Sequence, residues 1–274
     1  MNEQQIIDLS AQEFKDFTGK QKEDSFNLVD VRTPQEYAHF HIPGAVLVPL
    51  YELEGRLGEI AADKNTVFYC RSGKRSMSAS ILARDSGLLH QDIYNLAGGI
   101  LAYQGKTLAN YPKINLFSRL TNQKLVLQKA IDLEKGAQNF YSILADSIQD
   151  QELQNKISKL AKLEKGHAKM VYSLNAQAFD DDFEMVFAKA GGDIMEGGSE
   201  ISAWIDELKN VDEPGLHSYL LEMALEVETM AYDMYRNLAQ KSNSQELSEC
   251  FFKLAEQEKA HMRIVSSMFK DLNI

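Results

Sequence analysis

The first hundred residues alternate short apolar runs with amphipathic segments. Runs rich in β-branched and aromatic residues are NLVDV, AVLVP, TVFYC and DIYNL, at residues 27–31, 45–49, 66–70 and 92–96. The segments SAQEFKDF, YELEGRLGEI and RSMSASILARDSG have helical character. Strands that alternate with helices indicate a parallel sheet with crossover helices. We therefore predict an α/β domain over residues 1–107.

The hydrophobic period changes after a segment that contains glycine and proline. QGKTLANYPKINLF has no clear period, and we predict a linker at residues 108–117. Four long segments with helical spacing follow, at 118–148, 150–177, 213–241 and 244–272. Short turns join the segments in pairs, and a long crossover joins the two pairs. This is the topology of a ferritin-like four-helix bundle, which we predict for residues 118–274.

Length, composition and charge narrow the class of protein. The 274 residues are enough for two domains, and the hydrophobic fraction of 44% is that of a globular protein. A net charge of −11 argues against a nucleic-acid partner. The sequence has no apolar run of membrane-spanning length and no signal-peptide pattern at its start, so we expect a cytoplasmic protein without a membrane partner.

The cysteine count excludes two kinds of site. The chain has only two cysteines, Cys70 and Cys250. Two cysteines cannot form a disulfide framework, nor a four-cysteine metal site within one chain. Cys250 lies early in the last predicted helix, and we expect it to serve only in packing.

The two predicted helical hairpins repeat one another. AIDLEKGAQNFY (130–141) aligns with ALEVETMAYDMY (224–235), and LAKLEKGHAKMV (160–171) aligns with LAEQEKAHMRIV (254–265), always 94 residues apart. A single Glu-x-x-His on a helix is often a solvated face with a stray histidine. A duplication, however, has no packing reason to preserve carboxylates and imidazoles, which are costly to bury unpaired.

The repeated polar residues have the spacing of a metal site. Two helices supply one glutamate each, and the other two supply one Glu-x-x-His each, as in di-iron and di-manganese bundles. Two divalent cations about 3.5–4 Å apart need several carboxylates around them, and imidazole suits iron. We therefore predict two iron ions per chain, with manganese as an alternative. The predicted ligands are Glu134, Glu164, His167, Glu228, Glu258 and His261.

The spacing also suggests roles within this set. Glu164 and Glu258 each share a helix face with a histidine one turn away, so we expect them to bridge the two ions. The other two glutamates would then bind one ion each. Tyr141 and Tyr235 follow those glutamates by two turns on the same face. Each tyrosine is either a hydroxyl bonded to a ligand carboxylate or a core aromatic residue, and both can hold.

Residues 118–274 resemble the rubrerythrin branch of the ferritin-like superfamily. Rubrerythrins are non-haem di-iron proteins that reduce hydrogen peroxide, so the resemblance implies that chemistry here. Members usually carry an extra glutamate where this chain has Ala231, whose repeat counterpart is Ala137; a nearly symmetric site is expected. Members also usually carry a rubredoxin domain, which the cysteine count excludes, so the electron donor would be external. The resemblance also implies a homodimer formed through the bundle.

The segment FYCRSGKRSMSAS (68–80) is the second candidate site. Cys70 ends a predicted strand, and three cations follow before a helix begins. Loop N–H groups, the helix N-terminus and these cations favour the thiolate over the thiol. A thiolate in an anion-binding loop is a nucleophile for an anionic substrate; the alternative is a buried structural cysteine. We predict Cys70 as catalytic residue and, as substrate-binding residues, Arg71, Ser72, Gly73, Lys74, Arg75 and Ser76.

Loop length separates two families with such a loop. Cysteine-based phosphatases have five residues between the cysteine and the arginine, and this chain has four between Cys70 and Arg75. The tighter loop resembles the rhodanese family, which transfers sulfane sulfur through a cysteine persulfide. LVDVRTPQEYAHFHIPGAVLVPL and NLAGGILAY look like the family's first and closing signatures. The resemblance implies a small anionic donor such as thiosulfate or a persulfide, with Asp30 and Arg32 bracing the loop.

Together the two resemblances imply a sulfurtransferase domain fused to a di-iron oxidoreductase domain linked to peroxide or oxidative stress. One alternative is iron handling, in which the bundle oxidises or stores Fe²⁺ and the first domain delivers sulfur or binds a partner. Another is a sensor that uses the persulfide or the metal site as its input.

Overall fold

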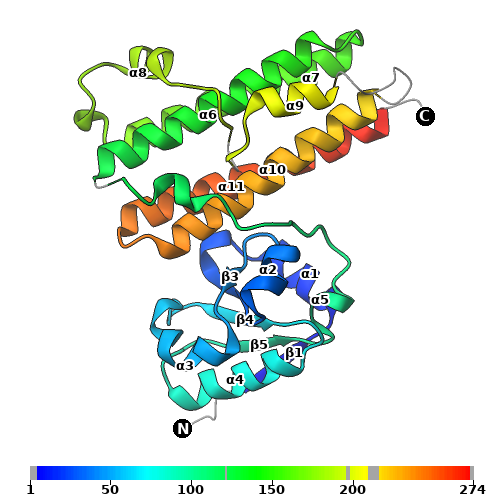
Figure 1. Cartoon of the computed structure of the whole chain (residues 1–274), viewed down its shortest axis with the longest axis vertical. Helices are drawn as coiled ribbons and strands as arrows, with labels where there is room; N and C mark the ends of the chain where they lie inside the picture. Colours follow the sequence, from blue (N-terminus) through cyan, green and yellow to red (C-terminus); the bar gives the residue numbers. More distant parts are fainter. Residues whose placement is uncertain (1–4, 121, 196–197, 209–215, 272–274) are drawn as a thin grey trace. The chain divides into compact units, whose positions relative to one another are not determined.

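The computed structural model describes residues 5–120, 122–195, 198–208 and 216–271 (Figure 1). The chain divides into two compact units. The first contains residues 1–112 and 235–256, and the second contains residues 113–234 and 257–274.

A five-stranded sheet forms the centre of the first unit. All of its strand pairs are parallel, in the order β1-β5-β4-β2-β3, which confirms the predicted α/β architecture. The strands are β1 (Ile6–Leu9), β2 (Phe26–Asp30), β3 (Val46–Leu47), β4 (Asn65–Tyr69) and β5 (Ile93–Leu96). The sequence pattern missed β1, an edge strand with two exposed positions and little apolar contrast.

Alternate residues of the inner strands pack on opposite faces of this sheet. In β4, for example, Val67 and Tyr69 enter one hydrophobic cluster, whereas Phe68 and then Cys70 enter the other. One face is covered by α1 (Ala11–Lys20), α2 (Pro34–His39) and α5 (Gly99–Ala102), and the other by α3 (Leu53–Arg56) and α4 (Lys74–Ser86) (Figure 1).

Two helical hairpins and a crossover follow. The long helices are α6 (Gln123–Asp146), α7 (Gln151–Leu174), α10 (Leu216–Lys241) and α11 (Gln245–Met268). The crossover contains α8 (Phe183–Lys189) and α9 (Ile201–Leu208). This arrangement confirms the ferritin-like bundle, with helices shorter than predicted; the predicted start at residue 213 lies outside the described residues. Within the described ranges, no helix has both the length and the apolar character needed to span a membrane.

Short polar residues fix where the helices begin. Asn122 accepts a hydrogen bond from the Leu125 N–H at the start of α6, and Asp150 accepts one from Leu153 at the start of α7. In the described ranges, 3-10 turns lie at Glu23–Ser25, Leu50–Glu52, Leu57–Glu59, Ile114–Phe117, Ala176–Ala178 and Phe269–Asp271.

A glycine lets the crossover lie against the bundle. A Cβ atom on Gly136, in the middle of α6, would stand 2.1 Å from the carbonyl oxygen of Ile194. Met195, the next residue, is fully buried in the bundle core. Only glycine at position 136 therefore allows the crossover backbone to approach α6 this closely.

The end of α10 contributes a buried cation to the first unit. Arg236 is fully buried and pairs with the Glu23 carboxylate. Its guanidinium also donates to the carbonyl oxygens of Glu23, Phe26 and Gly44 at 2.9–3.1 Å. These partners satisfy the buried charge, which would otherwise be costly.

Candidate functional site

Cys70 directly follows β4, and its thiol lies beneath the loop that leads into α4. The residue is only 1% exposed. The Gly73 N–H donates to Cys70 Sγ at 3.1 Å, and the N–H groups of Ser72 and Ser76 also bond to the sulfur. Burial alone raises the pKa of the thiol, but these donors and the Ser76 hydroxyl outweigh it, so the pKa of Cys70 is lowered. This loop favours a nucleophilic thiolate.

Glycines of the segment AGG (97–99) pack against the back of this loop. A Cβ on Gly99 would lie 2.4 Å from the Cys70 carbonyl oxygen, and Gly99 has a φ of 58°. The carbonyl oxygens of Cys70 and Arg71 accept the N–H groups of Ile100 and Leu101 at 2.8 and 3.1 Å. The loop is thus fixed by backbone bonds to α5, and its N–H groups remain directed at the sulfur.

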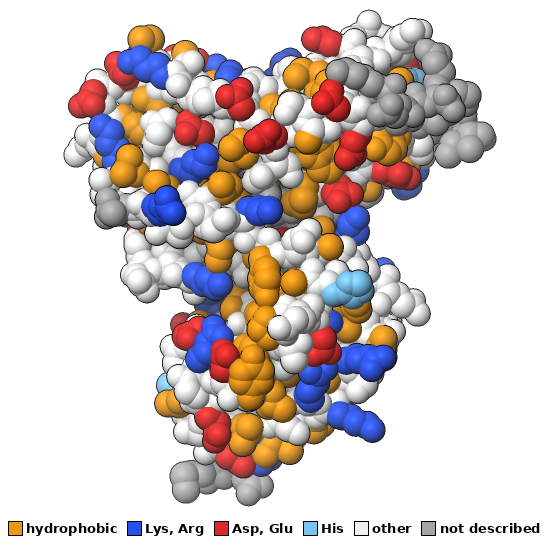
Figure 2. All heavy atoms as spheres, in the orientation of Figure 1, with side chains coloured by type: hydrophobic (Ala, Val, Ile, Leu, Met, Phe, Trp, Pro, Cys, Tyr) orange, Lys and Arg blue, Asp and Glu red, His pale blue; other side chains and the backbone are white. Residues whose placement is uncertain are grey.

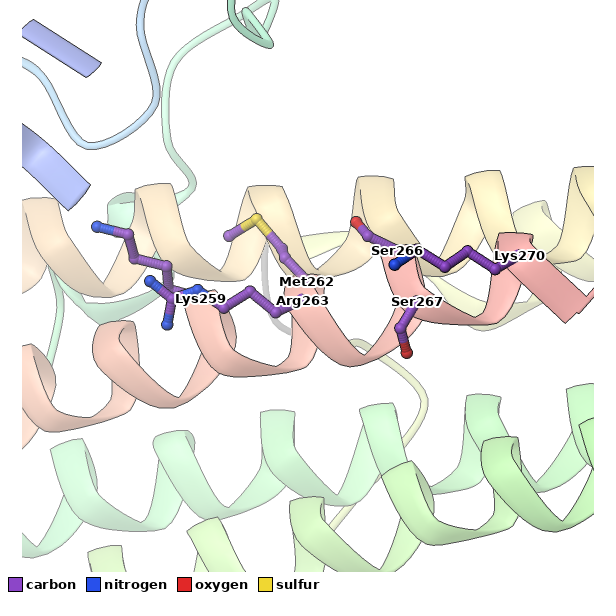
Figure 3. A pocket seen from close by; sticks show the side chains of 6 residues that line it. All are labelled: Lys259, Met262, Arg263, Ser266, Ser267 and Lys270. Atoms are coloured by element: carbon purple, nitrogen blue, oxygen red, sulfur yellow. The ribbon is translucent and has the colours of Figure 1, made fainter. Parts of the chain in front are cut away.

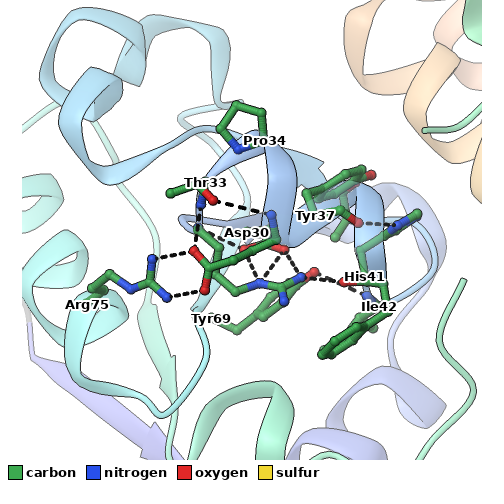
Figure 4. Close-up of polar contacts among 12 residues, drawn as sticks. Asp30, Thr33, Pro34, Tyr37, His41, Ile42, Tyr69 and Arg75 are labelled. Carbon is green, nitrogen blue, oxygen red and sulfur yellow. Dashed lines mark hydrogen bonds and ion pairs between the residues drawn. The ribbon is translucent and has the colours of Figure 1, made fainter. Parts of the chain in front are cut away.

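Arg75 is held by an acidic partner on α2 (Figure 4). Its two terminal nitrogens donate to the two oxygens of Glu36 at 2.6 and 2.7 Å. These bonds lower the pKa of Glu36 to about 2, despite some burial. The guanidinium of Arg75 is therefore directed at Glu36, whereas Arg71 and Lys74 are exposed on the same loop.

Asp30 and Arg32 form a buried pair at the end of β2. The Arg32 side chain donates to both Asp30 oxygens at 2.6–3.0 Å, and to the carbonyl oxygen of Phe40 at 2.7 Å. The backbone of the neighbouring Val31 bonds to Tyr69, which precedes Cys70. The pair thus braces the segment beside the cysteine strand and presents no reactive group to solvent.

The second candidate site lies inside the helical bundle. The six predicted ligands come from all four long helices and are almost inaccessible, with exposed fractions of 0–6%. They are Glu134 on α6, Glu164 and His167 on α7, Glu228 on α10, and Glu258 and His261 on α11. In the described part of the chain, the four residues of the two Glu-x-x-His pairs offer ligand atoms within 4.8 Å of one another.

Three carboxylate oxygens surround each histidine. Those around His167 Nδ1 lie at 3.0–3.4 Å and belong to Glu164 (Oε2), Glu134 (Oε2) and Glu258 (Oε1).

Those around His261 Nδ1 lie at 3.2–3.4 Å and belong to Glu164 (Oε1), Glu228 (Oε2) and Glu258 (Oε2). Glu164 and Glu258 therefore place one oxygen in each group, whereas Glu134 and Glu228 each join one group.

These separations fit bound metal. Ligands bound at about 2.1 Å and 90–109° from one another are separated by roughly 3.0–3.4 Å. The facing atoms Glu164 Oε2, Glu258 Oε1, His167 Nδ1 and His261 Nδ1 are buried and make no hydrogen bond to the described residues. Buried polar atoms in native proteins normally have partners. Bound cations would supply them.

The electrostatics of this cluster also favour cations. Burial disfavours the charged form of His167 and His261, but the surrounding carboxylates outweigh it and raise the pKa of both. Burial raises the pKa of Glu134 and of Glu228. The cluster thus attracts positive charge, either as protons or as metal ions.

The two repeated tyrosines are both buried in the bundle. The Tyr141 hydroxyl donates to Glu228 Oε1, and both residues are buried. Tyr235 is fully buried, and its ring stacks on Phe251 at 6.0 Å. Tyr141 can therefore orient a carboxylate of the cluster. Ala137 and Ala231 are both 1% exposed, so packing alone accounts for their size.

The surface carries no single dominant charge in the view of Figure 2. On the described residues of that face, Lys and Arg side chains lie among Asp and Glu side chains. A groove of about 370 Å³ lies over the outer side of α11 (Figure 3). It is lined by Lys259, Met262, Arg263, Ser266, Ser267 and Lys270.

Three polar residues near Cys70 were not assigned from the sequence. Asn95, on β5, accepts from Ser76 and donates to Asp8 on β1, and Glu36 holds Arg75. The position of Asn95 within the apolar run DIYNL could have indicated a buried polar role for it. Asp8 gave no such signal, because exposed carboxylates are common in such segments. Glu36 stands in the segment that resembles the first rhodanese signature, but that resemblance gave it no role.

Comparison with known proteins supports both family resemblances, one for each domain. A rhodanese-like domain model matches residues 10–106, and a rubrerythrin model matches residues 126–209 and 220–274. The chain is similar to a sulfurtransferase of Allochromatium vinosum, at 42% identity over 28% of this chain and 69% of that protein. It is also similar to the thiosulfate sulfurtransferase PspE of Escherichia coli, at 34% identity over 26% of this chain and 68% of that protein.

One further relative is matched over less of its length. The chain covers 55% of the putative sulfur carrier protein YrkF of Bacillus subtilis, at 33% identity over 39% of this chain. Among solved structures, a rhodanese-like domain protein of Staphylococcus aureus is 25% identical, with a TM-score of 0.34 over 38% of this chain and 98% of that one.

Proposed function

Because the chain belongs to the rubrerythrin family and also carries a rhodanese-like domain, we propose that it unites two enzymatic centres. The first is a sulfurtransferase centre at Cys70, and the second is a di-iron oxidoreductase centre in the bundle that reduces peroxide. The observation that best supports the first is the ring of N–H donors around Cys70 Sγ. The two groups of ligand atoms around His167 and His261 support the second.

Sulfur transfer proceeds in two balanced steps. The Cys70 thiolate attacks the outer sulfur of a thiosulfate-like donor, a new S–S bond forms, and the donor's own S–S bond breaks as sulfite leaves with the electron pair. A nucleophilic acceptor then attacks the terminal sulfur of the persulfide, and Cys70 departs as a thiolate. The loop N–H groups hold the negative charge on sulfur at both stages.

The exposed loop cations should bind the anionic donor. We expect Arg71→Ala and Lys74→Ala each to raise KM for thiosulfate by roughly 10–150-fold with little change in kcat, because a charge-assisted contact contributes about 1.5–3 kcal/mol. Arg75→Ala should instead lower kcat, since Arg75 bonds to Glu36 and positions the loop. Steady-state kinetics of the three variants with thiosulfate and cyanide measure this split.

Glu36→Gln is the matched partner variant. It keeps the size of the side chain but weakens the bidentate pair, so it should reproduce the kcat effect of Arg75→Ala. A KM effect confined to Arg75→Ala would show that Arg75 binds the donor directly.

The bundle residues can bind two metal ions without any side chain from outside the cluster. Iron bound there would supply the electrons that convert peroxide and two protons into two waters. The four glutamates balance the charge of two divalent ions, and the Tyr141 hydroxyl holds Glu228 in place. Since all six ligands are buried, an external donor must return electrons through the protein rather than by touching the metal.

A coupled assay tests the peroxide reaction. We expect iron-loaded protein with NADH and a supplied reductase to consume hydrogen peroxide steadily, and Glu164→Ala to abolish this consumption. The oxidation of NADH at stoichiometric peroxide is the measurement. Rapid oxygen-dependent oxidation of added Fe²⁺ without peroxide turnover would contradict the proposal and favour iron handling.

A further inference from the structure

A chain of hydrogen bonds connects Cys70 to the edge of the sheet. Ser76 Oγ lies 3.5 Å from Cys70 Sγ and 2.6 Å from Asn95 Oδ1. Asn95 Nδ2 in turn lies 2.7 Å from Asp8 Oδ1. Ser76 and Asn95 are 0% and 3% exposed, whereas Asp8 is exposed on β1. Asp8 and Asn95 are register partners of adjacent parallel strands, so the backbone holds the contact in place.

Asp8 determines which way the Asn95 amide points. An ionised carboxylate only accepts hydrogen bonds, so it must face the amide NH₂ group of Asn95. The amide oxygen of Asn95 is then left facing Ser76. An oxygen there can only accept, so it competes with Cys70 Sγ for the hydroxyl proton of Ser76.

Ser76 has one proton and three acceptors within reach, which are Asn95 Oδ1 at 2.6 Å, the Gly73 carbonyl oxygen at 3.2 Å and Cys70 Sγ at 3.5 Å. If the proton lies on the Asn95 side, the oxygen presents a lone pair to Cys70, which favours the thiol. If the proton turns to the sulfur, it stabilises the thiolate. We propose that Asn95, held in one orientation by Asp8, is a positioning residue that draws the Ser76 hydroxyl proton away from Cys70 and so limits how readily the thiol ionises in the proposed sulfur transfer.

The other charged groups near the loop stay the same when Asn95 is changed. They are Arg71, Lys74 and Arg75 of the loop, Glu36 of α2, and the buried pair of Asp30 and Arg32 at the end of β2. Asparagine and leucine are both uncharged, so Asn95→Leu also leaves the net charge unchanged. A change in the ionisation of Cys70 in that variant therefore reports on the hydrogen-bond chain.

The pH dependence of Cys70 alkylation by iodoacetamide tests this inference. All variants carry Cys250→Ala, so that a single thiol reacts. We expect Asn95→Leu to move the midpoint of the rate profile down by roughly one pH unit, because the Ser76 proton becomes free to bond to the thiolate. Ser76→Ala should move it up by a similar amount. In the Ser76→Ala background, Asn95→Leu should have no effect.

Asp8→Asn provides a second route that leaves the buried residues intact. The new amide at position 8 can donate to Asn95, so the Asn95 side chain is no longer held in one orientation. Asp8→Asn should therefore lower the midpoint of the alkylation profile when Ser76 is present. A purely electrostatic effect of the lost Asp8 charge would shift the alkylation midpoint equally with and without the Ser76 hydroxyl. A midpoint shift by Asp8→Asn that persists in the Ser76→Ala background therefore contradicts the inference. An unchanged or raised midpoint in Asn95→Leu, or in Asp8→Asn if the former does not fold, also overturns it.

Alkylation needs no sulfur donor. The inference therefore fails or holds independently of the sulfurtransferase assay. Loss of sulfur transfer with the expected midpoint shifts would refute the proposed function alone, and normal sulfur transfer with unmoved midpoints would refute the role of Asn95 alone.

Discussion

Cys70→Ala should abolish sulfur transfer, lowering kcat/KM for thiosulfate and cyanide by roughly 10³-fold or more, as expected when the nucleophile of a covalent mechanism is removed. The fold should persist, since alanine fits a site where the thiol is already enclosed. Thiocyanate formation is the measurement. Mass spectrometry of the wild-type protein after incubation with thiosulfate should show the mass of one added sulfur on the peptide that contains Cys70.

Cys250→Ala is the matched control. Cys250 is also buried, at 2% exposed, but it lies on α11 among packing residues. This variant should transfer sulfur at the wild-type rate. Full activity of Cys70→Ala would contradict the assignment, and faster hydrolysis of aryl phosphates than sulfur transfer would show that the loop belongs to a phosphatase.

Loss of a bridging glutamate should remove more metal than loss of a terminal one. The wild-type chain should bind two iron ions, Glu134→Ala about one, and Glu164→Ala close to none, because Glu164 places an oxygen beside each histidine. Elemental analysis of purified protein measures these ratios. Wild-type protein stripped of metal should melt roughly 5–10 °C lower than loaded protein, since ligands that bind only the folded state stabilise it.

Glu256→Ala is the matched control for the ligand variants. Glu256 is exposed and lies two residues before Glu258 on the same helix, so its loss should leave two ions bound. Saturation of the wild-type chain at one ion would contradict a two-metal site. Equal metal content in Glu134→Ala and Glu164→Ala would contradict the division into bridging and terminal ligands.

Helix spacing is enough to identify the candidate metal ligands. A one-turn separation puts Glu164 and His167 on one helix face, and the 94-residue repeat shows that the same pair occurs again. The sequence could not reveal that the Tyr141 hydroxyl bonds to Glu228 of the opposite hairpin, because spacing along one helix says nothing about the neighbour across the bundle. Tyr235 has the same spacing, and its ring stacks on Phe251.

The loop at Cys70 also combines features that the sequence reveals with contacts that only the structure reveals. Its length and its cations are local features, so the sequence alone indicated an anion-binding loop with a cysteine nucleophile. The partner of Arg75 was not local, since Glu36 lies 39 positions away and reaches the loop only because β2 and β4 pair in the sheet. Asp8 and Asn95 lie 87 positions apart and meet through the pairing of β1 with β5.

The two-domain organisation, the helical repeat and the residue types of both sites could thus be predicted from the amino-acid sequence, because they depend on periodicity and spacing within single segments. The folded chain was needed to show which oxygens face which histidine, which cations remain exposed at the loop, and which way Asn95 points. Each of these depends on contacts between segments far apart in the chain, where strand register and helix packing set distances that no local pattern encodes.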